Sequence, residues 1–348
     1  MCKIEFFDDS FNLLSYHMVD VQSIGTDYLT FEPSQIAIYG ESKACRGCFV
    51  RLSGVSSFEG IVSDVQPTDA GETVSVRPLQ ALFDFDVFTS ECTDTAQFIF
   101  DAVNSNIVNN ADTLQNRPIQ LINSAPAAER PMENNNAKVN LLTVLTSALT
   151  VYQIAVDCKL DLSAGGKKIV AEIKQITDTQ TVEADKKNVL QKKITLGDSY
   201  GSTNKIIVRK THKDKETGIV SVIDTVPFFL HSDGSVSAED RDRITPVFFA
   251  LESIEECADW DSKALIKATE KLTPQKFDNE IVLTYRRGDS LIRPQAIKLG
   301  TPVTVWYGKK PYSSILTGRT LQKDTITLTF GCVRVALTKK LIMERRNK

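Results

Sequence analysis

The chain has 348 residues, too many for one ordinary hydrophobic core, and this length predicts two to four compact units. Its 42% hydrophobic and 24% charged content is that of a folded soluble protein, and a net charge of −3 argues against a general binder of nucleic acid or anionic membranes. No apolar run approaches a membrane span, so we expect no membrane insertion by this chain. Seven scattered cysteines and an acidic N-terminus indicate reduced thiols in a cytoplasm rather than secretion.

The first 88 residues alternate apolar and polar positions, and range 1–88 is therefore predicted to form a small β-barrel. Its expected strands lie between turn-forming residues such as Pro33, Gly54 and Gly71. The strands are expected at 4–7, 28–31, 36–39, 47–52, 58–63 and 73–76.

Range 89–195 changes character and is predicted to be an α+β insert domain. Asp94, followed three residues later by Gln97, is typical of a helix N-cap, and this helix should end in the Asn-rich segment 104–110. An apolar stripe predicts a second helix over 139–152. A hairpin over 154–173 and a lysine-rich turn at 185–193 should complete the insert.

Two further units are expected. Range 196–243 should be a β-rich connecting domain, with strands at 205–210 and 218–223. Range 244–345 should be a second barrel that carries an inserted helix over 254–272, since Ser253 and Glu256 fit a capping box. Residues 346–348 should be a frayed tail. The predicted fold class is thus mainly β with α+β inserts.

The two predicted barrels match each other in sequence pattern. A three-strand meander at 300–341 can be laid over 47–76 with changes of only one or two residues in the turns. Convergent strand patterning is the alternative explanation for the match. The paired positions are Gly47 with Gly300, Val50 and Leu52 with Val303 and Val305, Phe58, Ile61 and Val62 with Tyr312, Ile315 and Leu316, and Val74 and Val76 with Ile326 and Leu328.

Two serine motifs are better explained as turns than as nucleophile sites. Range 197–201 matches G-x-S-x-G around Ser199, but a strand-like segment follows where a nucleophile elbow needs a helix. Range 288–291 spells GDSL around Ser290, a block seen in one class of esterases. That class needs a histidine downstream of the serine, and the last histidine here is His231.

Cysteine, histidine and lysine patterns also favour structural roles. Cys45 and Cys48 form a C-x-x-C, but no second ligand pair accompanies them and they open a strand rather than a helix. The histidines lie in unrelated segments, and the lysine clusters lack interleaved aromatic residues, which favours solvated hairpin turns. We therefore expect no catalytic, cofactor-binding or metal-ligating residue. The histidines are His17, His212 and His231, and the lysine clusters are 167–168, 186–193 and 205–215.

The sequence resembles the baseplate hub proteins of phages and prophages. The predicted meander at 300–341 carries the pattern Y-x-S-I-L-T-G followed by I-x-L-x-F-G-x-x-R-x-x-L-T-K-K-L, across residues 312–341. Segments 58–62, 76–84 and 243–249 are similar to the same family's first barrel and to the segment before its helix. The resemblance covers essentially the whole chain. The family includes the N-terminal hub region of tail-associated lysins, and it resembles late-control D proteins and the hubs of contractile tails.

The resemblance implies a non-enzymatic structural hub. Three copies would form a ring of six similar barrels that adapts a sixfold tail tube to a threefold tip. Implied partners are a distal tail protein or tail-tube hexamer ring, the tape-measure protein and a tip, receptor-binding or spike protein, with DNA only in transit. The implied location is the virion tail tip or baseplate, and the bacterial host cytoplasm during assembly.

Strands at 47–63 and 300–317 are expected to be the barrel edges that meet neighbouring subunits. Many relatives continue into a peptidoglycan hydrolase or fibre-binding region, whereas this sequence stops soon after its last expected strand. Any cell-wall-degrading activity is therefore expected in another chain or in a part removed from this one. The alternative function is a tail-associated cell-wall hydrolase, built around Ser199 or Ser290, or a carbohydrate-binding adhesin.

Overall fold

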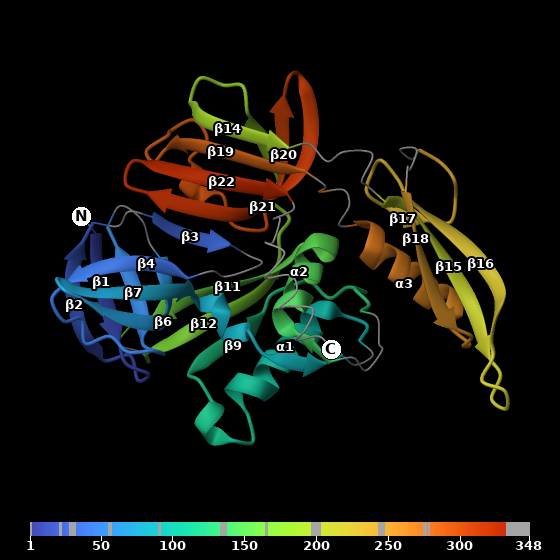
Figure 1. Ribbon diagram of the computed structural model, residues 1–348, viewed down its shortest axis with the longest axis horizontal. Coiled ribbons are helices and arrows are strands. Elements are labelled where there is room, and N and C mark those ends of the chain that lie inside the picture. Colours follow the sequence, from blue (N-terminus) through green and yellow to red (C-terminus); the bar gives the residue numbers. More distant parts are fainter. Residues whose placement is uncertain are drawn as a thin grey trace.

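The structure is a computed structural model in which the chain folds mainly into β-sheets. The prediction of a mainly β chain with two barrel-like units and α+β inserts is confirmed. Figure 1 shows the second barrel above the first, the insert next to the first barrel and below the second, and an arm projecting away from both barrels. The residues described are 2–20, 23–27, 33–54, 58–89, 92–132, 138–163, 166–195, 203–242, 248–273, 277 and 279–331.

The first barrel is a curled sheet of six strands in the order β2-β1-β5-β6-β7-β4. All neighbours in it are antiparallel, and alternate side chains such as Ile4, Val50 and Val74 are fully buried inside. The strands are β1 (Cys2–Phe7), β2 (Leu13–Val19), β4 (Ser34–Tyr39), β5 (Phe49–Ser53), β6 (Phe58–Thr68) and β7 (Gly71–Pro78).

The second barrel has the strand order β13-β20-β21-β22-β19-β14. Its inner face buries residues such as Leu283, Val305 and Phe330. Two of its strands come from the range that the sequence assigned to the insert, and β3 (Ser23–Asp27) reaches across from the first barrel to pair with β21. The strands are β13 (Gln180–Glu183), β14 (Val189–Thr195), β19 (Glu280–Arg286), β20 (Pro302–Tyr307), β21 (Lys310–Gln322) and β22 (Thr325–Gly331).

The two barrels share one circular strand order. Four strands correspond directly: β5 to β20, β6 to β21, β7 to β22 and β4 to β19. The two remaining places are filled by β1 and β2 in the first barrel and by β13 and β14 in the second. The first barrel is open between β2 and β4, whereas the second is open between β13 and β14. One difference is that β13 runs parallel to β20, while β1 is antiparallel to β5. The sequence repeat is therefore a repeat of six strands, longer than the three-strand match predicted.

Equivalent glycines begin the meander in both barrels. The Gly47 N–H donates to the Val62 carbonyl at 2.9 Å, and the Gly300 N–H donates to the Leu316 carbonyl at 2.7 Å. Their φ angles are +93° and +85°, a region that glycine enters without steric cost. The sequence paired these same residues, so the pairing is confirmed.

Equivalent β-bulges interrupt the long strands β6 and β21. The register shifts at Ser63 in one barrel and at Thr317 in the other. The Ser63 hydroxyl donates to the Ser75 carbonyl at 3.1 Å, and the Thr317 hydroxyl lies 3.3 Å from the Thr329 carbonyl. The Thr317 hydroxyl also lies 3.0 Å from the Gly331 carbonyl, so its contacts only partly match those of Ser63. A bulge of the same size at the same place is nevertheless more than alternation alone would produce.

The insert packs two helices on a three-stranded sheet of order β11-β12-β9. Asp94 caps α1 by accepting from the Ala96 N–H, as predicted, and Asn140 caps α2 in the same way. Its apolar core extends to Phe7, Phe11 and Phe49 of the first barrel. The elements are β8 (Asp86–Phe88), α1 (Thr95–Val103), β9 (Ile119–Asn123), β10 (Lys138–Asn140), α2 (Leu141–Tyr152), β11 (Ile154–Asp161) and β12 (Lys168–Gln175).

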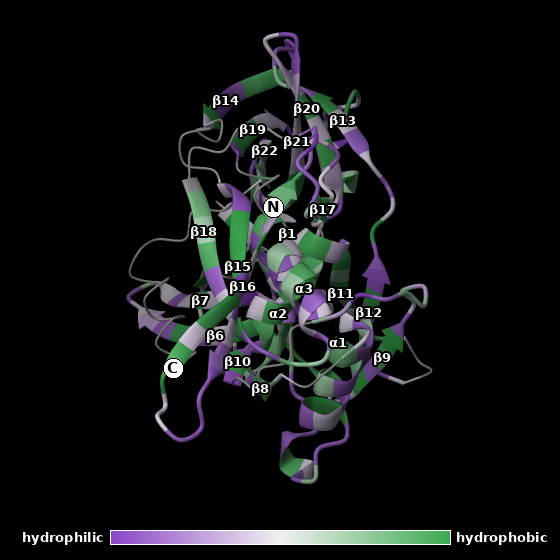
Figure 2. Ribbon diagram, turned by 90° about the vertical axis from the view of Figure 1, so that its right-hand side faces the viewer, coloured by the Kyte–Doolittle hydropathy of each residue, from purple (hydrophilic) through white to green (hydrophobic). Residues whose placement is uncertain are grey.

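The arm, residues 203–273, is a four-stranded sheet covered on one face by α3 (Figure 2). The helix expected over 254–272 begins only at Trp260, and the predicted capping box of Ser253 and Glu256 does not form. The preceding segment pairs in parallel with β15 along its whole length, so Ser253 lies in a strand. The elements are β15 (Thr203–Lys213), β16 (Val220–Leu230), β17 (Val236–Ser237), β18 (Phe248–Glu255) and α3 (Trp260–Leu272).

Candidate functional site

The joint between the two barrels is made by β3. Its backbone pairs antiparallel with Gly318–Gln322 of β21, while its side chain Ile24 is completely buried in the core of the first barrel. One strand thus belongs to one barrel by its side chain and to the other by its backbone. The sequence does not predict β3, because a five-residue strand with Gly25 and Asp27 has little apolar alternation. The strand expected at 28–31 lies outside the described residues.

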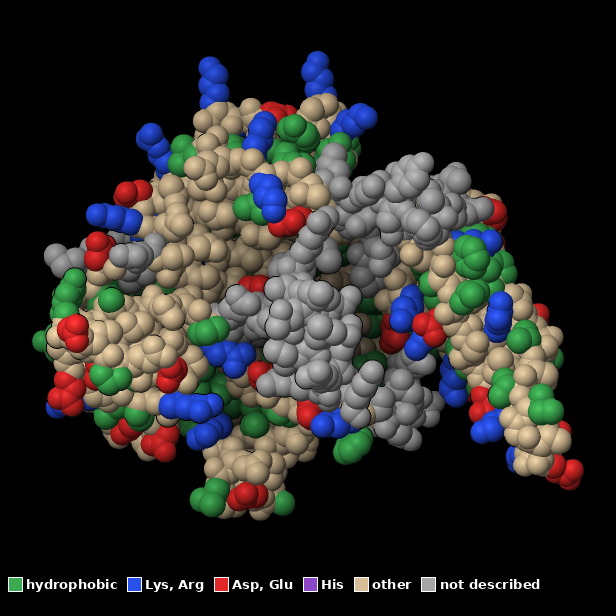
Figure 3. Space-filling model, viewed as in Figure 1, with side chains coloured by type: hydrophobic (Ala, Val, Ile, Leu, Met, Phe, Trp, Pro, Cys, Tyr) green, Lys and Arg blue, Asp and Glu red, His purple; other side chains and the backbone are tan. Residues whose placement is uncertain are grey.

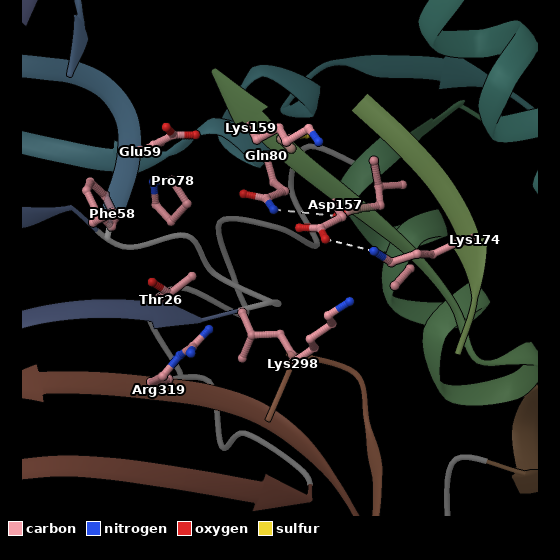
Figure 4. Close-up of a pocket in the computed structure, with 14 residues that line it drawn as sticks. Thr26, Phe58, Glu59, Pro78, Gln80, Asp157, Lys159, Lys174, Lys298 and Arg319 are labelled. Carbon is pink, nitrogen blue, oxygen red and sulfur yellow. Dashed lines mark hydrogen bonds and ion pairs between the residues drawn. The ribbon is translucent and has the colours of Figure 1, made fainter. Parts of the chain in front are cut away.

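A cavity of about 360 Å³ lies beside this joint, where both barrels meet the insert. Four basic side chains line it, against Glu59 and Asp157. Figure 4 shows Arg319 rising from β21 toward Thr26, while Lys298 extends toward the ion pair of Asp157 and Lys174. The basic residues are Lys159, Lys174, Lys298 and Arg319.

Charged side chains that line this cavity form ion pairs and hydrogen bonds with one another and with the neighbouring units. Asp157 accepts from Lys174 at 2.7 Å. Burial lowers the pKa of the Arg319 guanidinium, and the charge of Asp157 partly opposes that shift. Glu59 bridges the first barrel to the insert, since it accepts from Arg51 at 2.9 Å and from the Leu160 N–H at 2.6 Å.

The chemistry of the cavity provides no activated nucleophile. Cys158 is its one thiol, and burial raises the pKa of that thiol, which keeps it protonated. Among the described residues, no group of three His, Cys, Asp or Glu side chains is placed to hold a metal ion. The described helices also include none long and apolar enough to cross a bilayer.

The serine motifs show no catalytic arrangement where the structure describes them. Ser199 and the whole G-x-S-x-G motif lie outside the described residues. The GDSL segment forms a turn after β19, in which the Asp289 carboxylate accepts from the N–H groups of Leu291 and Ile292 at 3.0 and 3.1 Å. Ser290 is exposed. Asp289 thus shapes the turn, as the sequence analysis expected of this segment.

The two C-x-x-C cysteines meet at a turn before β5. Their Sγ atoms are 2.7 Å apart, and the Cys48 N–H donates to the Cys45 carbonyl at 3.0 Å. Burial and the contact with Cys45 raise the pKa of Cys48 to about 11. A protonated, buried thiol is a poor nucleophile at neutral pH, so this pair supports the structural interpretation.

The three histidines occupy three separate environments. His17 lies edge-on to the Phe6 ring in the first barrel, and His231 is buried in the arm between the Arg241 carbonyl and the Ser237 hydroxyl at 2.6 and 2.8 Å. His212 is exposed, 3.3 Å from Glu256. The structure therefore brings none of them together.

The lysine clusters lie on the surface, but not all of them are turns. Lys186 pairs with Glu183 beside the turn between β13 and β14, as expected. Lys192 and Lys193 instead lie in β14, an exposed strand at the open edge of the second barrel. The sequence does not predict β14, because the strand forms by pairing with β19, about 90 residues further along the chain.

The strands at 47–63 and 300–317 are not the edges of their sheets, so that part of the expectation is wrong, and their contact with neighbouring subunits stays a prediction. β5 lies between β1 and β6, and β20 lies between β13 and β21, so both are interior strands. The exposed edges among the described strands are β2 and β4 in the first barrel and β13 and β14 in the second. β2 carries exposed Leu13, Tyr16 and Met18, which is an apolar row on a sheet edge.

Known proteins with the same fold come from phage baseplates and prophage tails. No protein-family model matches the sequence, and no curated protein matches it. In structure, the chain is similar to a chain of the phage P2 baseplate in its activated conformation with Ca (TM-score 0.52, 12% identity, 95% of this chain and 98% of that one). It is also similar to prophage tail protein gp18 from Listeria monocytogenes (TM-score 0.52, 12% identity, 99% of both chains). A third is the 43 kDa tail protein of prophage MuSo2 from Shewanella oneidensis (TM-score 0.50, 13% identity, 94% and 98%).

Proposed function

We propose that the chain is a structural hub of the tail tip or baseplate in a tailed phage or phage-tail-like particle, with no catalytic role. The observation that carries the proposal is the six-strand repeat, with its equivalent glycines and equivalent bulges at Ser63 and Thr317. The likeness in fold to baseplate and tail proteins over nearly the whole chain supports it.

A duplicated barrel suits a symmetry adaptor. Two successive subunits of a hexameric tube present the same surface twice, and a chain with two equivalent barrels can meet both. Three copies then supply six barrels to a sixfold tube and a threefold symmetry to the tip. The arm and insert lie outside the repeat, so they are available for other tail components.

The expected partners follow from this position in the tail. The barrels contact a distal tail protein or the tube ring on one side and a tip, receptor-binding or spike protein on the other. The tape-measure protein or the tip closes the lumen until DNA passes through. The protein is part of the virion, and it assembles in the host cytoplasm.

The oligomeric state tests the proposal. Sedimentation equilibrium and native mass spectrometry of the full chain, alone and co-expressed with its ring partner, are expected to show three copies. A protein that remains monomeric at high concentration, and that never becomes trimeric beside its ring partner, would show that the proposal is wrong.

A further inference from the structure

We propose that neighbouring copies join through opposite charges, with the basic β14–β19 side of one second barrel docked on the acidic outer edge of β6 in the next copy. This inference rests on the proposed ring, and it names the two surfaces that close it. Three observations lead to it: the joint inside the chain, the equivalent place on the first barrel, and the charge of each barrel.

The joint inside the chain provides the template. The second half of β21, Gly318–Gln322, receives β3, which lies beside β4 at the open side of the first barrel. The first half of β21 is occupied by β20, so β3 fills the edge that β20 leaves free. In a ring of like barrels, the contact between chains repeats the contact within a chain.

The equivalent edge on the first barrel is open. Counted from the two bulges, Asp64–Thr68 of β6 corresponds to Gly318–Gln322 of β21. β5 covers only Phe58–Ile61, and among the described strands none pairs with the outer side of the second half of β6. Asp64 and Gln66 are exposed there, and Asp69 is exposed in the turn just beyond Thr68. Pro67 removes one N–H donor, so we expect side chains to hold a neighbour more than a backbone ladder does.

The surface that should dock there follows from the shared strand order. β3 lies beside β4 in the first barrel, and β19, next to β14, takes the place of β4 in the second. The β14–β19 side is therefore the counterpart of the side that already makes the joint inside the chain. It exposes Leu190, Lys192 and Lys193 along β14. Within the chain Lys192 pairs with Asp185 at 2.5 Å and Lys193 with Glu280 at 3.3 Å, so an acidic neighbour would join these surface pairs.

The two barrels carry opposite charge. The strand-bearing range of the first barrel, 2–78, has 11 Asp or Glu and 5 Lys or Arg, a net −6. The strand-bearing ranges of the second barrel, 180–195 and 279–331, have 12 Lys or Arg and 5 Asp or Glu, a net +7. In Figure 3 basic side chains project from the second barrel, and acidic ones gather on the first.

This asymmetry decides how copies can meet. Contacts between two first barrels or two second barrels place like charges together, which is unfavourable, whereas a first barrel attracts a second one. Head-to-tail contacts of unlike surfaces close a ring instead of forming an isologous dimer. Around the proposed ring, acidic and basic barrels therefore alternate.

A charge exchange tests the joint. In Lys192→Glu with Lys193→Glu, and separately in Asp64→Lys with Asp69→Lys, we expect the trimer to dissociate at least about tenfold more readily. Mixing the two variants should restore trimers in part, because in every mixed ring two of the three joints again pair opposite charges. Combining all four changes in one chain should restore the trimer fully. Raising NaCl from about 0.05 M to about 0.5 M should weaken the wild-type trimer, because salt screens exposed charges.

The control reverses Lys213 and Lys215 at the exposed tip of the β15–β16 hairpin, far from both barrels (Figure 1), and should leave the trimer unchanged. Circular dichroism melting verifies that each variant folds. A stable wild-type trimer that neither pair of reversals weakens overturns this joint and leaves the hub proposal standing. A wild type that forms no trimer alone or with its ring partner overturns both.

Discussion

Arg130 is a buried charge that ties three segments of the insert together. Its side chain is 4% exposed, and its guanidinium contacts both carboxylate oxygens of Asp94 at 2.9 and 3.0 Å and the Pro126 carbonyl at 2.6 Å. Asp94 in turn caps α1. A buried ion pair of this kind is costly to break from one side, because the remaining charge stays buried without a partner.

Replacing Arg130 should therefore destabilise the chain strongly. We expect Arg130→Ala to lower the free energy of unfolding by about 3–5 kcal/mol, measured by urea denaturation of the full chain. Arg241→Ala is the matched control, because the Arg241–Glu239 pair is 63% and 72% exposed and should contribute less than about 1 kcal/mol. Equal losses in the two variants would contradict this view of the insert.

The sequence predicts one half of this pair and not the other. Asp94 stands before an apolar stripe, and local spacing alone identifies it as a cap. Arg130 lies 36 residues away in a segment with two nearby prolines, which predicts only a loop. Its burial depends on how α1 and the loop are placed by the rest of the fold, so no local pattern reveals it.

At the scale of elements, the repeated meanders are held by glycines that are equivalent in backbone but not in surroundings. A Cβ on Gly300 would lie 2.6 Å from Leu149 and 2.8 Å from Ile176, in the insert. A Cβ on Gly47 would meet nothing within 4 Å. The second barrel is therefore packed tightly against the insert at this turn, while the first is not.

Alanine at the two glycines should separate backbone strain from packing. Gly47→Ala should cost about 1–2 kcal/mol of unfolding free energy, because alanine is strained at this positive φ. Gly300→Ala should cost about 1–3 kcal/mol more, because Leu149 and Ile176 must also move. Thermal melting of both variants measures the difference, and a Gly47→Ala loss as large as that of Gly300→Ala would show that packing adds nothing.

Strand existence was predictable where alternation is strong, and strand pairing was not. The meanders, both insert helices and the hairpin over 154–173 follow from period and turn residues. β3 and β13 are short, and β14 is rich in lysine. Each of the three pairs with a strand more than about 80 residues away in the sequence. The late start of α3 has the same cause, since parallel pairing with β15 holds 248–255 in a strand.

At the scale of the whole molecule, sheet membership groups the chain differently from the ranges drawn along the sequence. The second barrel takes strands from 180–195 and 279–331, and the arm between them is an insertion in that barrel. The six-strand repeat therefore spans nearly the full chain. Sequence alone showed the repeat but not the open edges, because edges depend on which strands meet.

The central claim is that three copies of this chain build one ring of six alternating barrels. Cryo-electron microscopy of the trimer bound to its tube-ring partner measures this directly. We predict a threefold ring in which first and second barrels alternate and β14 of each copy lies against β6 of the next. A ring of another copy number, or one in which like barrels touch, would contradict the account.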